Sequence, residues 1–501
     1  MKRILYQLLP RLWGSGKFSA VDHESLDYFR GLGVDCVWYT GIIRHATRKA
    51  DEGCTPSHKQ IVKGEAGSPY AITDYYDVNP YLADVPDRRM EEFLQLVERT
   101  HLHGLKVIID FIPNHVARDY NSVSAPAGVR SLGVDDNTSV HWAPENDFFY
   151  YPGETLRLPE PYDGPRYEEY PAKASGNCFS PCPSATDWYE TIKINYCDFP
   201  TETWDKMYEI VRFWALKGVD GFRCDMVELV PPDFMKWLIA RIRQEFPHMV
   251  FIAEVYDVEK YRMYVEDVGF DLLYDKSGLY DSLRAVTCNG LSARQVTWNW
   301  QFLGDLQPRM LNFLENHDEQ RVASDFFAGS AEAGYAALGV SLLLNTASFM
   351  LYFGQEVGER GMDNEPFSGI NGRTSIFDWW TVRSLQALKR GIHGDPTALS
   401  DREKAILGRY REALALARRP AFAEGRTFDL CYCQEGGFNP ERHFAFLRSD
   451  GTETWLVVAN FGPDADLSIL IPNVAADYLG TSLLTPVTVH VPERDFVAIK
   501  L

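Results

Sequence analysis

Eight short runs of apolar residues recur in the chain up to Phe353, and amphipathic segments of helical period precede several of them. Strands that alternate with helices pair in parallel, and eight such strands close into a (β/α)8 barrel. An open doubly wound sheet is the alternative, but no GxGxxG motif follows the first run to support a dinucleotide site. We therefore predict an α/β fold built on a (β/α)8 TIM barrel. The predicted strands are Arg3–Leu9, Val34–Tyr39, Lys106–Asp110, Val219–Cys224, Val250–Glu254, Phe270–Asp275, Met310–Leu314 and Ser348–Phe353.

Two regions depart from this alternation. Residues 116–190 are rich in Pro, Gly, Ser and aromatic residues and follow the third predicted strand, which indicates a long functional insertion. After residue 420, runs such as HFAFLRS and TWLVVANF read as strands with no helices between them. We predict a barrel domain A in two parts (1–115 and 191–420), an insertion domain B (116–190) and a C-terminal antiparallel β-sandwich, domain C (421–501).

The composition excludes some classes of protein. Acidic residues outnumber basic ones by 70 to 50, which gives a net charge of −20 and argues against nucleic-acid binding. No apolar stretch reaches eighteen residues, so we expect no membrane span. The odd number of cysteines, nine, favours free thiols in a reducing compartment. The first residues also lack the long apolar region of a secretory signal, so we expect a cytoplasmic protein.

Charged residues occur at the predicted C-terminal ends of the strands, where the active site of a (β/α)8 enzyme lies. In GVDGFRCDMVELV, Arg223 and Asp225 share one face of an otherwise apolar strand. Such a pair is costly in a core, so its position at a strand end indicates a function. The polar residues at these strand ends are Asp110, Asn114, His115, Arg223, Asp225, Glu254, Asn316, His317 and Asp318.

Three carboxylates at one barrel mouth fit glycoside hydrolysis. That reaction needs one carboxylate as nucleophile or base and one protonated acid for the leaving oxygen. Neighbouring acids raise one pKa and so supply the proton donor, while a third carboxylate stabilises the sugar cation of the transition state. Metal-assisted hydrolysis also uses His and Asp clusters, but no HExxH motif is present.

Four motifs follow one another along the chain: DFIPNH, GFRCD, FIAEV and FLENHD. In this order they resemble the four conserved regions of the alpha-amylase family, glycoside hydrolase family 13. SPYAITDYYDVNP resembles the segment that carries a tyrosine under the sugar ring, and YQLLPR resembles the first strand. The resemblance covers nearly the whole chain and implies that domain B forms one wall of the cleft.

The resemblance also implies a role for each matching residue. Asp225 would be the nucleophile, Glu254 the general acid and then the general base, and Asp318 the residue that stabilises the transition state. Arg223 would keep Asp225 ionised by charge and hydrogen bonding. The substrate-binding residues that it implies are Tyr70, His115, Arg223, His317 and Arg321.

Calcium is the point at which the chain departs from the family. Many relatives bind it through the equivalent of Asn114, acids of domain B and a histidine four residues after the nucleophile, where this chain has Leu229. The stretch after the first strand, GSGKFSAVD, also lacks the family's acidic loop. We expect that no cofactor is required and no metal is bound, with Asn114 as the ligand if calcium binds.

The function implied is that of a retaining glycoside hydrolase. We expect it to cleave α-glucosidic bonds, mainly α-1,4, in malto-oligosaccharides or starch- and glycogen-type glucans by a covalent double displacement. A transglycosylase, or an enzyme on a small α-glucoside such as trehalose or sucrose, is the alternative, because it uses the same acids. A non-catalytic glycan-binding relative is the alternative class, but such proteins usually lack one of the three acids and this chain has all three.

Overall fold

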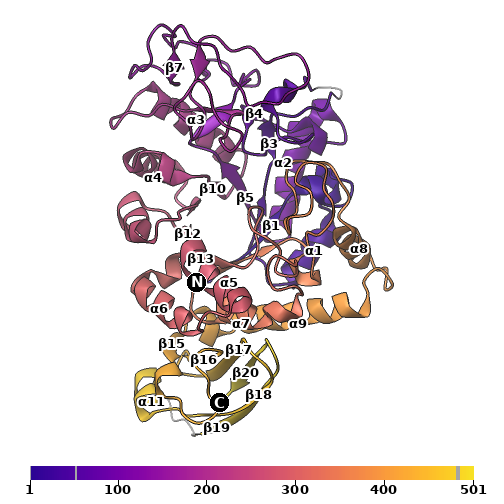
Figure 1. The fold of residues 1–501 in the computed structure, drawn as a ribbon, viewed down its shortest axis with the longest axis vertical. Coiled ribbons are helices and arrows are strands. Elements are labelled where there is room, and N and C mark those ends of the chain that lie inside the picture. Colours follow the sequence, from indigo (N-terminus) through magenta and orange to yellow (C-terminus); the bar gives the residue numbers. More distant parts are fainter. Residues whose placement is uncertain (1, 51–53, 481–485) are drawn as a thin grey trace.

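A closed barrel of eight parallel strands is the centre of the computed structural model, which describes residues 2–50, 54–480 and 486–501 (Figure 1). Around the barrel the strands follow the order β1-β14-β13-β12-β11-β10-β5-β2. Each strand overlaps one of the eight predicted runs, so the predicted fold is confirmed. The strands are β1 (Ile4–Leu8), β2 (Cys36–Tyr39), β5 (Lys106–Phe111), β10 (Gly221–Cys224), β11 (Val250–Ala253), β12 (Leu272–Tyr274), β13 (Met310–Phe313) and β14 (Ser348–Tyr352).

Helices connect most consecutive barrel strands. The predicted amphipathic segments of helical period form helices, among them α1 to α4, which precede β2, β5, β10 and β11. Local capping fixes some of the ends; Asp22, for example, accepts a hydrogen bond from the backbone N–H of Ser25 at the start of α1. The helices are α1 (His23–Gly31), α2 (Arg89–Leu102), α3 (Glu202–Leu216), α4 (Pro232–Glu245), α5 (Asp281–Asn289), α6 (Arg294–Leu303), α7 (Tyr335–Leu343), α8 (Arg383–Ile392) and α9 (Asp401–Ala417).

The insertion leaves the barrel after β5 and returns at the same place. β6 (His115–Ala117) pairs with β9 (Thr191–Lys193) in an antiparallel ribbon, so the first and last residues of the insertion lie side by side. A second small ribbon joins β7 (Tyr150–Tyr151) to β8 (Ala172–Lys173). In Figure 1 the insertion lies at the upper end of the molecule, and the C-terminal sheets lie at the opposite end.

A further ribbon lies in the long connection between β2 and β5. Its strands are β3 (Ile43–His45) and β4 (Ile72–Val78), which pair antiparallel with an irregular register. The chain between them includes Lys63 and Tyr70 and belongs to the barrel part of the sequence rather than to the insertion. This connection therefore brings a second set of side chains to the barrel mouth.

The C-terminal part consists of two antiparallel sheets with a common apolar core. One sheet contains β15 (Arg426–Asp429), β16 (His443–Ser449), β17 (Thr454–Asn460) and β20 (Phe496–Lys500), and the other contains β18 (Ala465–Ile469) and β19 (Val487–Val491). The prediction that no helix interrupts these strands is wrong, because α11 (Asn473–Leu479) packs Ala475 and Leu479 into the same core. Two apolar residues one turn apart are too short a pattern to indicate a helix from sequence.

Candidate active site

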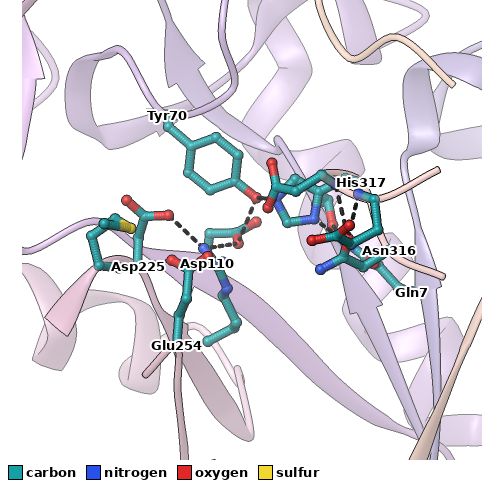
Figure 2. A network of polar contacts seen from close by, with 12 residues as sticks. Gln7, Tyr70, Asp110, Asp225, Glu254, Asn316 and His317 are labelled. Atoms are coloured by element: carbon teal, nitrogen blue, oxygen red, sulfur yellow. Dashed lines mark hydrogen bonds and ion pairs between the residues drawn. The ribbon is translucent and has the colours of Figure 1, made fainter. Parts of the chain in front are cut away.

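The strand ends bring the predicted acids together. Parallel register pairs Cys224 of β10 with Ala253 of β11, so Asp225 and Glu254 continue from adjacent strands at the same level. Asp318 follows β13 in the chain. Figure 2 shows Asp225 and Glu254 close together beside Tyr70, with His317 close to the tyrosine hydroxyl.

Arg223 joins two of these acids. Its guanidinium is fully buried and donates from Nη1 to Asp225 Oδ1 at 2.6 Å, while Nη2 lies 2.8 Å from Glu254 Oε1. The arginine therefore binds both carboxylates, whereas the sequence assigned it to Asp225 alone. A single cation therefore stabilises two acids, through a hydrogen bond to Asp225 and an ion pair with Glu254.

The site holds more negative than positive charge. Burial and the neighbouring Glu254 carboxylate raise the pKa of Asp225, and the Arg223 guanidinium opposes that rise. Enclosure by the cleft walls and the Glu254 carboxylate raise the pKa of Asp318 to about 7, although its side chain still faces the open cleft. The raised pKa values of Asp225 and Asp318 favour the retention of a proton on these acids near neutral pH.

His317 is held as a neutral hydrogen-bonding group. Burial lowers its pKa well below the usual value, and the nearby Arg223 charge lowers it further. The Gln7 amide lies 2.8 Å from Nδ1, and Nε2 lies 2.6 Å from the Tyr70 hydroxyl and 3.1 Å from Asp318 Oδ2. If Gln7 donates to Nδ1, the neutral ring carries its proton on Nε2, on the side of Tyr70 and Asp318.

His115 is neutral as well. Burial lowers its pKa to about 3, and the Lys193 and Lys63 ammonium groups lower it further. Its ring lies 5.2 Å from that of Trp188, which belongs to the insertion. A neutral imidazole at this point can donate to or accept from a sugar hydroxyl.

Most of the predicted catalytic and substrate-binding residues line one cavity of about 280 Å³. Tyr70, His115, Asp225, Glu254, His317 and Asp318 all line it. Sequence reasoning missed Lys63, Glu190 and Tyr256, which also line it, because no pattern marks them and only the fold brings their loops to the barrel mouth. Tyr256 donates its hydroxyl to Glu254 Oε1 at 2.7 Å, and Met226 donates its backbone N–H to Glu254 Oε2 at 2.9 Å.

Arg321, predicted to bind substrate, lies away from the cavity. Its fully buried guanidinium donates to Glu315 Oε2 at 2.9 Å, to the Phe353 carbonyl at 2.9 Å and to the Thr374 hydroxyl at 2.8 Å, and it does not line the cavity. Glu315 precedes it by six residues and neutralises it locally. Arg321 therefore fixes the chain after β13 rather than binding substrate.

The place expected for calcium is filled by a side chain of the protein. The Lys193 ammonium donates to Asn114 Oδ1 and, at 2.7 Å, to the Leu229 carbonyl. An ammonium already bound to these two oxygens repels a second cation, and oxygen ligands are what calcium requires. The residues present therefore do not fit a calcium ion at Asn114.

Comparisons with known proteins agree with this geometry. A family model described as the alpha amylase catalytic domain matches residues 14–379. The chain belongs to the alpha-amylase family. This match confirms the family that the four motifs indicated. It also confirms the prediction that the protein is a glycoside hydrolase.

Several relatives in this family have names that describe different reactions. An alpha-amylase from Dictyoglomus thermophilum is 24% identical over 78% of this chain and 71% of its own length. An oligo-1,6-glucosidase from Heyndrickxia coagulans is 24% identical over 73% of this chain and 68% of its own. The chain spans only 42% of an alpha-1,4-glucan:maltose-1-phosphate maltosyltransferase from Cereibacter sphaeroides, with 28% identity.

Solved structures share the fold over the full chain. A maltogenic alpha-amylase from Thermotoga neapolitana superposes with a TM-score of 0.64 at 21% identity, covering 100% of this chain and 96% of that one. An alpha-amylase from H. orenii gives a TM-score of 0.65 at 21% identity, covering 99% of each chain. In the described residues, no helix is both long and apolar enough to span a membrane.

Proposed function

We propose that this protein is a retaining glycoside hydrolase that cleaves α-glucosidic bonds in malto-oligosaccharides and related α-glucans. The observation that carries the proposal is the single guanidinium of Arg223, which binds Asp225 and Glu254 at the mouth of the barrel. A retaining pair needs its two carboxyl groups close together, whereas an inverting pair leaves room for a water between them. Two acids on one guanidinium support the retaining arrangement.

In the first step, Asp225 attacks the anomeric carbon and Glu254 gives its proton to the leaving oxygen. In the second, Glu254 takes a proton from water, and the hydroxide releases the sugar from Asp225. The hydrogen bonds from Tyr256 and from the Met226 backbone hold the Glu254 carboxyl in place through both steps. Asp318 and neutral His317 then contact hydroxyls of the same sugar, and Tyr70 stacks on its ring.

The charge of the cavity favours a neutral sugar over a phosphorylated one. Asp225, Glu254, Asp318 and Glu190 line it together with Lys63, and Arg223 adds one further cation beneath them. A phosphate group would add to the excess of negative charge. A trehalose-6-phosphate hydrolase from Bacillus subtilis is 25% identical over 46% of this chain, and its name implies a phosphorylated disaccharide as substrate. For the present protein we favour an unmodified α-glucan.

We further propose that the enzyme needs no calcium, since the Lys193 ammonium lies between the two oxygens, Asn114 Oδ1 and the Leu229 carbonyl, that would bind it.

All nine cysteines are free thiols, which supports the proposal of a reducing, cytoplasmic compartment. Transfer to a sugar acceptor would use the same covalent intermediate and remains the alternative reaction.

The test is product analysis with maltoheptaose. We expect shorter α-anomeric products from the wild type and a loss of at least about 10³-fold in kcat for Asp225→Asn, which cannot form the intermediate. β-Anomeric products would contradict the retaining mechanism. Products longer than maltoheptaose at early times would identify the protein as a transglycosylase instead.

A further inference from the structure

The wall of the catalytic cavity carries an ion pair that the proposed mechanism does not use. Lys63 Nζ lies 2.8 Å from Glu190 Oε1, and both residues line the cavity together with Asp225 and Glu254. Lys63 comes from the connection between β3 and β4, and Glu190 is the residue before β9. The pair therefore bridges the barrel and the insertion across the place where substrate binds.

One oxygen of this pair has no partner. The Glu190 side chain is only 6% exposed, and its Oε2 atom is buried without a hydrogen bond from any described residue. An unpaired carboxylate oxygen is costly to bury unless a ligand or water satisfies it. Because Glu190 lines the cavity, a rotation of its carboxylate brings this oxygen to a group bound there, which can then donate to it.

Lys63 offers the opposite hydrogen-bonding function beside it. An ammonium has three N–H donors, and the Glu190 carboxylate needs only one of them. The Lys63 ammonium also lies 5.3 Å from the centre of the Tyr189 ring, which holds it against the insertion. An N–H donor thus lies 2.8 Å from one oxygen of the carboxylate whose other oxygen has no partner among the described residues. Neighbouring hydroxyls on a sugar ring are spaced closely enough to contact both groups.

We propose that Lys63 and Glu190 bind a pair of neighbouring hydroxyls on a glucosyl unit of the substrate, at the point where that unit contacts the insertion. Glu190 Oε2 accepts from one hydroxyl, and Lys63 donates to the next. The indole ring of Trp188, which also lines the cavity, offers an apolar surface for the same sugar. This inference rests on the proposed function and identifies two residues that determine substrate specificity.

The experiment measures maltotriose binding by calorimetry in Asp225→Asn, a background in which no substrate is consumed. We expect Glu190→Gln and Lys63→Met, each added to this background, to weaken maltotriose binding about tenfold or more, because each removes a charge-assisted hydrogen bond. In the otherwise native enzyme we expect KM for maltotriose to rise more than kcat falls. Melting temperatures measured in parallel show whether each variant is folded.

Glu202→Gln is the matched control. Glu202 also joins the barrel to the insertion, through Arg130 at 2.7 Å, but both side chains are exposed and lie outside the cavity. We expect it to leave maltotriose binding unchanged. If Glu190→Gln and Lys63→Met are folded and bind maltotriose as tightly as their background, the proposed hydroxyl-binding role of these two residues is wrong. If Asp225→Asn itself does not bind maltotriose, the proposed function is wrong as well.

Discussion

At the scale of single residues, the structure shows why a charge pair lies in an apolar strand. Arg223 is buried between aromatic rings, with its guanidinium carbon 5.4 Å from the ring centres of Trp38 and of Tyr274. Its two terminal nitrogens are used by Asp225 and Glu254. The rings enclose the guanidinium, and its charge lies between the two acids.

Arg223→Lys tests this arrangement. A lysine keeps the charge but has one compact ammonium, which cannot bind both carboxylates in a fixed plane. We expect kcat for maltoheptaose to fall about 10²-fold with the fold retained, as measured by initial rates and circular dichroism. Arg243→Lys, at an arginine that binds Asp271 at 2.7 Å, is the control. A kcat close to that of the wild type in Arg223→Lys would show that positive charge alone is sufficient.

Asp275 is a buried acid that makes the stability of the protein depend on pH. It follows β12, and burial, together with the Asp281 charge, raises its pKa from 3.8 to about 7. The folded state therefore holds a proton that the unfolded state releases between about pH 4 and pH 7. Protons bound in excess by the folded state make the free energy of unfolding decrease as pH rises through this window.

Asp275→Asn is predicted to remove that pH dependence. We expect the variant to lose less stability than the wild type between pH 5 and pH 8, by on the order of 2 kcal/mol. Urea unfolding at the two pH values measures the difference. Asp477→Asn, at an exposed residue of α11, is the control. If wild type and Asp275→Asn lose the same stability between pH 5 and pH 8, Asp275 is not the group that holds the proton in the folded state.

At the scale of elements, one lysine connects the insertion to the strand that carries the proposed nucleophile. Lys193 is the last residue of β9, and its ammonium binds Asn114, just after β5, and the Leu229 carbonyl in the turn after Asp225. Burial lowers the pKa of Lys193 to about 8, so the cation is held mainly by its oxygen partners. Three segments far apart in the sequence are thereby held at one point beside the cleft.

Lys193→Met should weaken this connection. The substitution leaves two oxygens without their charged donor, and we expect a loss of about 2 kcal/mol in the free energy of unfolding. We expect a strong chelator to leave the melting temperature of the wild type unchanged, because the Lys193 ammonium already binds the Asn114 and Leu229 oxygens. Calorimetry measures both effects, with Lys173→Met in the same insertion as the control. A wild type that melts several degrees lower with chelator would contradict the proposal.

At the scale of the whole molecule, Arg448 joins the C-terminal sheets to the barrel. This fully buried residue of β16 donates to the carbonyls of Ala421, Phe422 and Gly425, and to that of Leu344 at the end of α7. Burial lowers its pKa to about 9. Carbonyl oxygens from both parts of the chain thus share one cation, which makes the parts stabilise each other.

Arg448→Met is predicted to make the barrel and the C-terminal sheets unfold separately. Several carbonyl oxygens lose their donor, and we expect a loss of about 3 kcal/mol, with the single thermal transition broadening or splitting in two. Scanning calorimetry and limited proteolysis between α9 and β15 measure the change. Arg426→Met, at an exposed residue that donates to the Tyr478 carbonyl, is the matched control. A transition unchanged in midpoint and width would refute the role of Arg448.

Much of the barrel and the proposed catalytic set could be predicted from the sequence, because both depend on local pattern. Buried parallel strands are continuous apolar runs, and polar residues at their ends mark the barrel mouth. Arg321 shows the limit of this reasoning. It lies three residues after Asp318, but side-chain packing directs its guanidinium to Glu315 and away from the cavity.

The sequence by itself determined the eight strands, the family and the positions of Asp225, Glu254 and Asp318, because each depends on neighbours within a few residues. The tertiary structure alone decided that Arg223 binds two acids, that Lys193 lies between Asn114 and Leu229, and that Lys63 meets Glu190. These contacts join segments separated by tens to more than a hundred residues. Only the closing of the barrel and the return of the insertion bring such segments to within hydrogen-bonding distance.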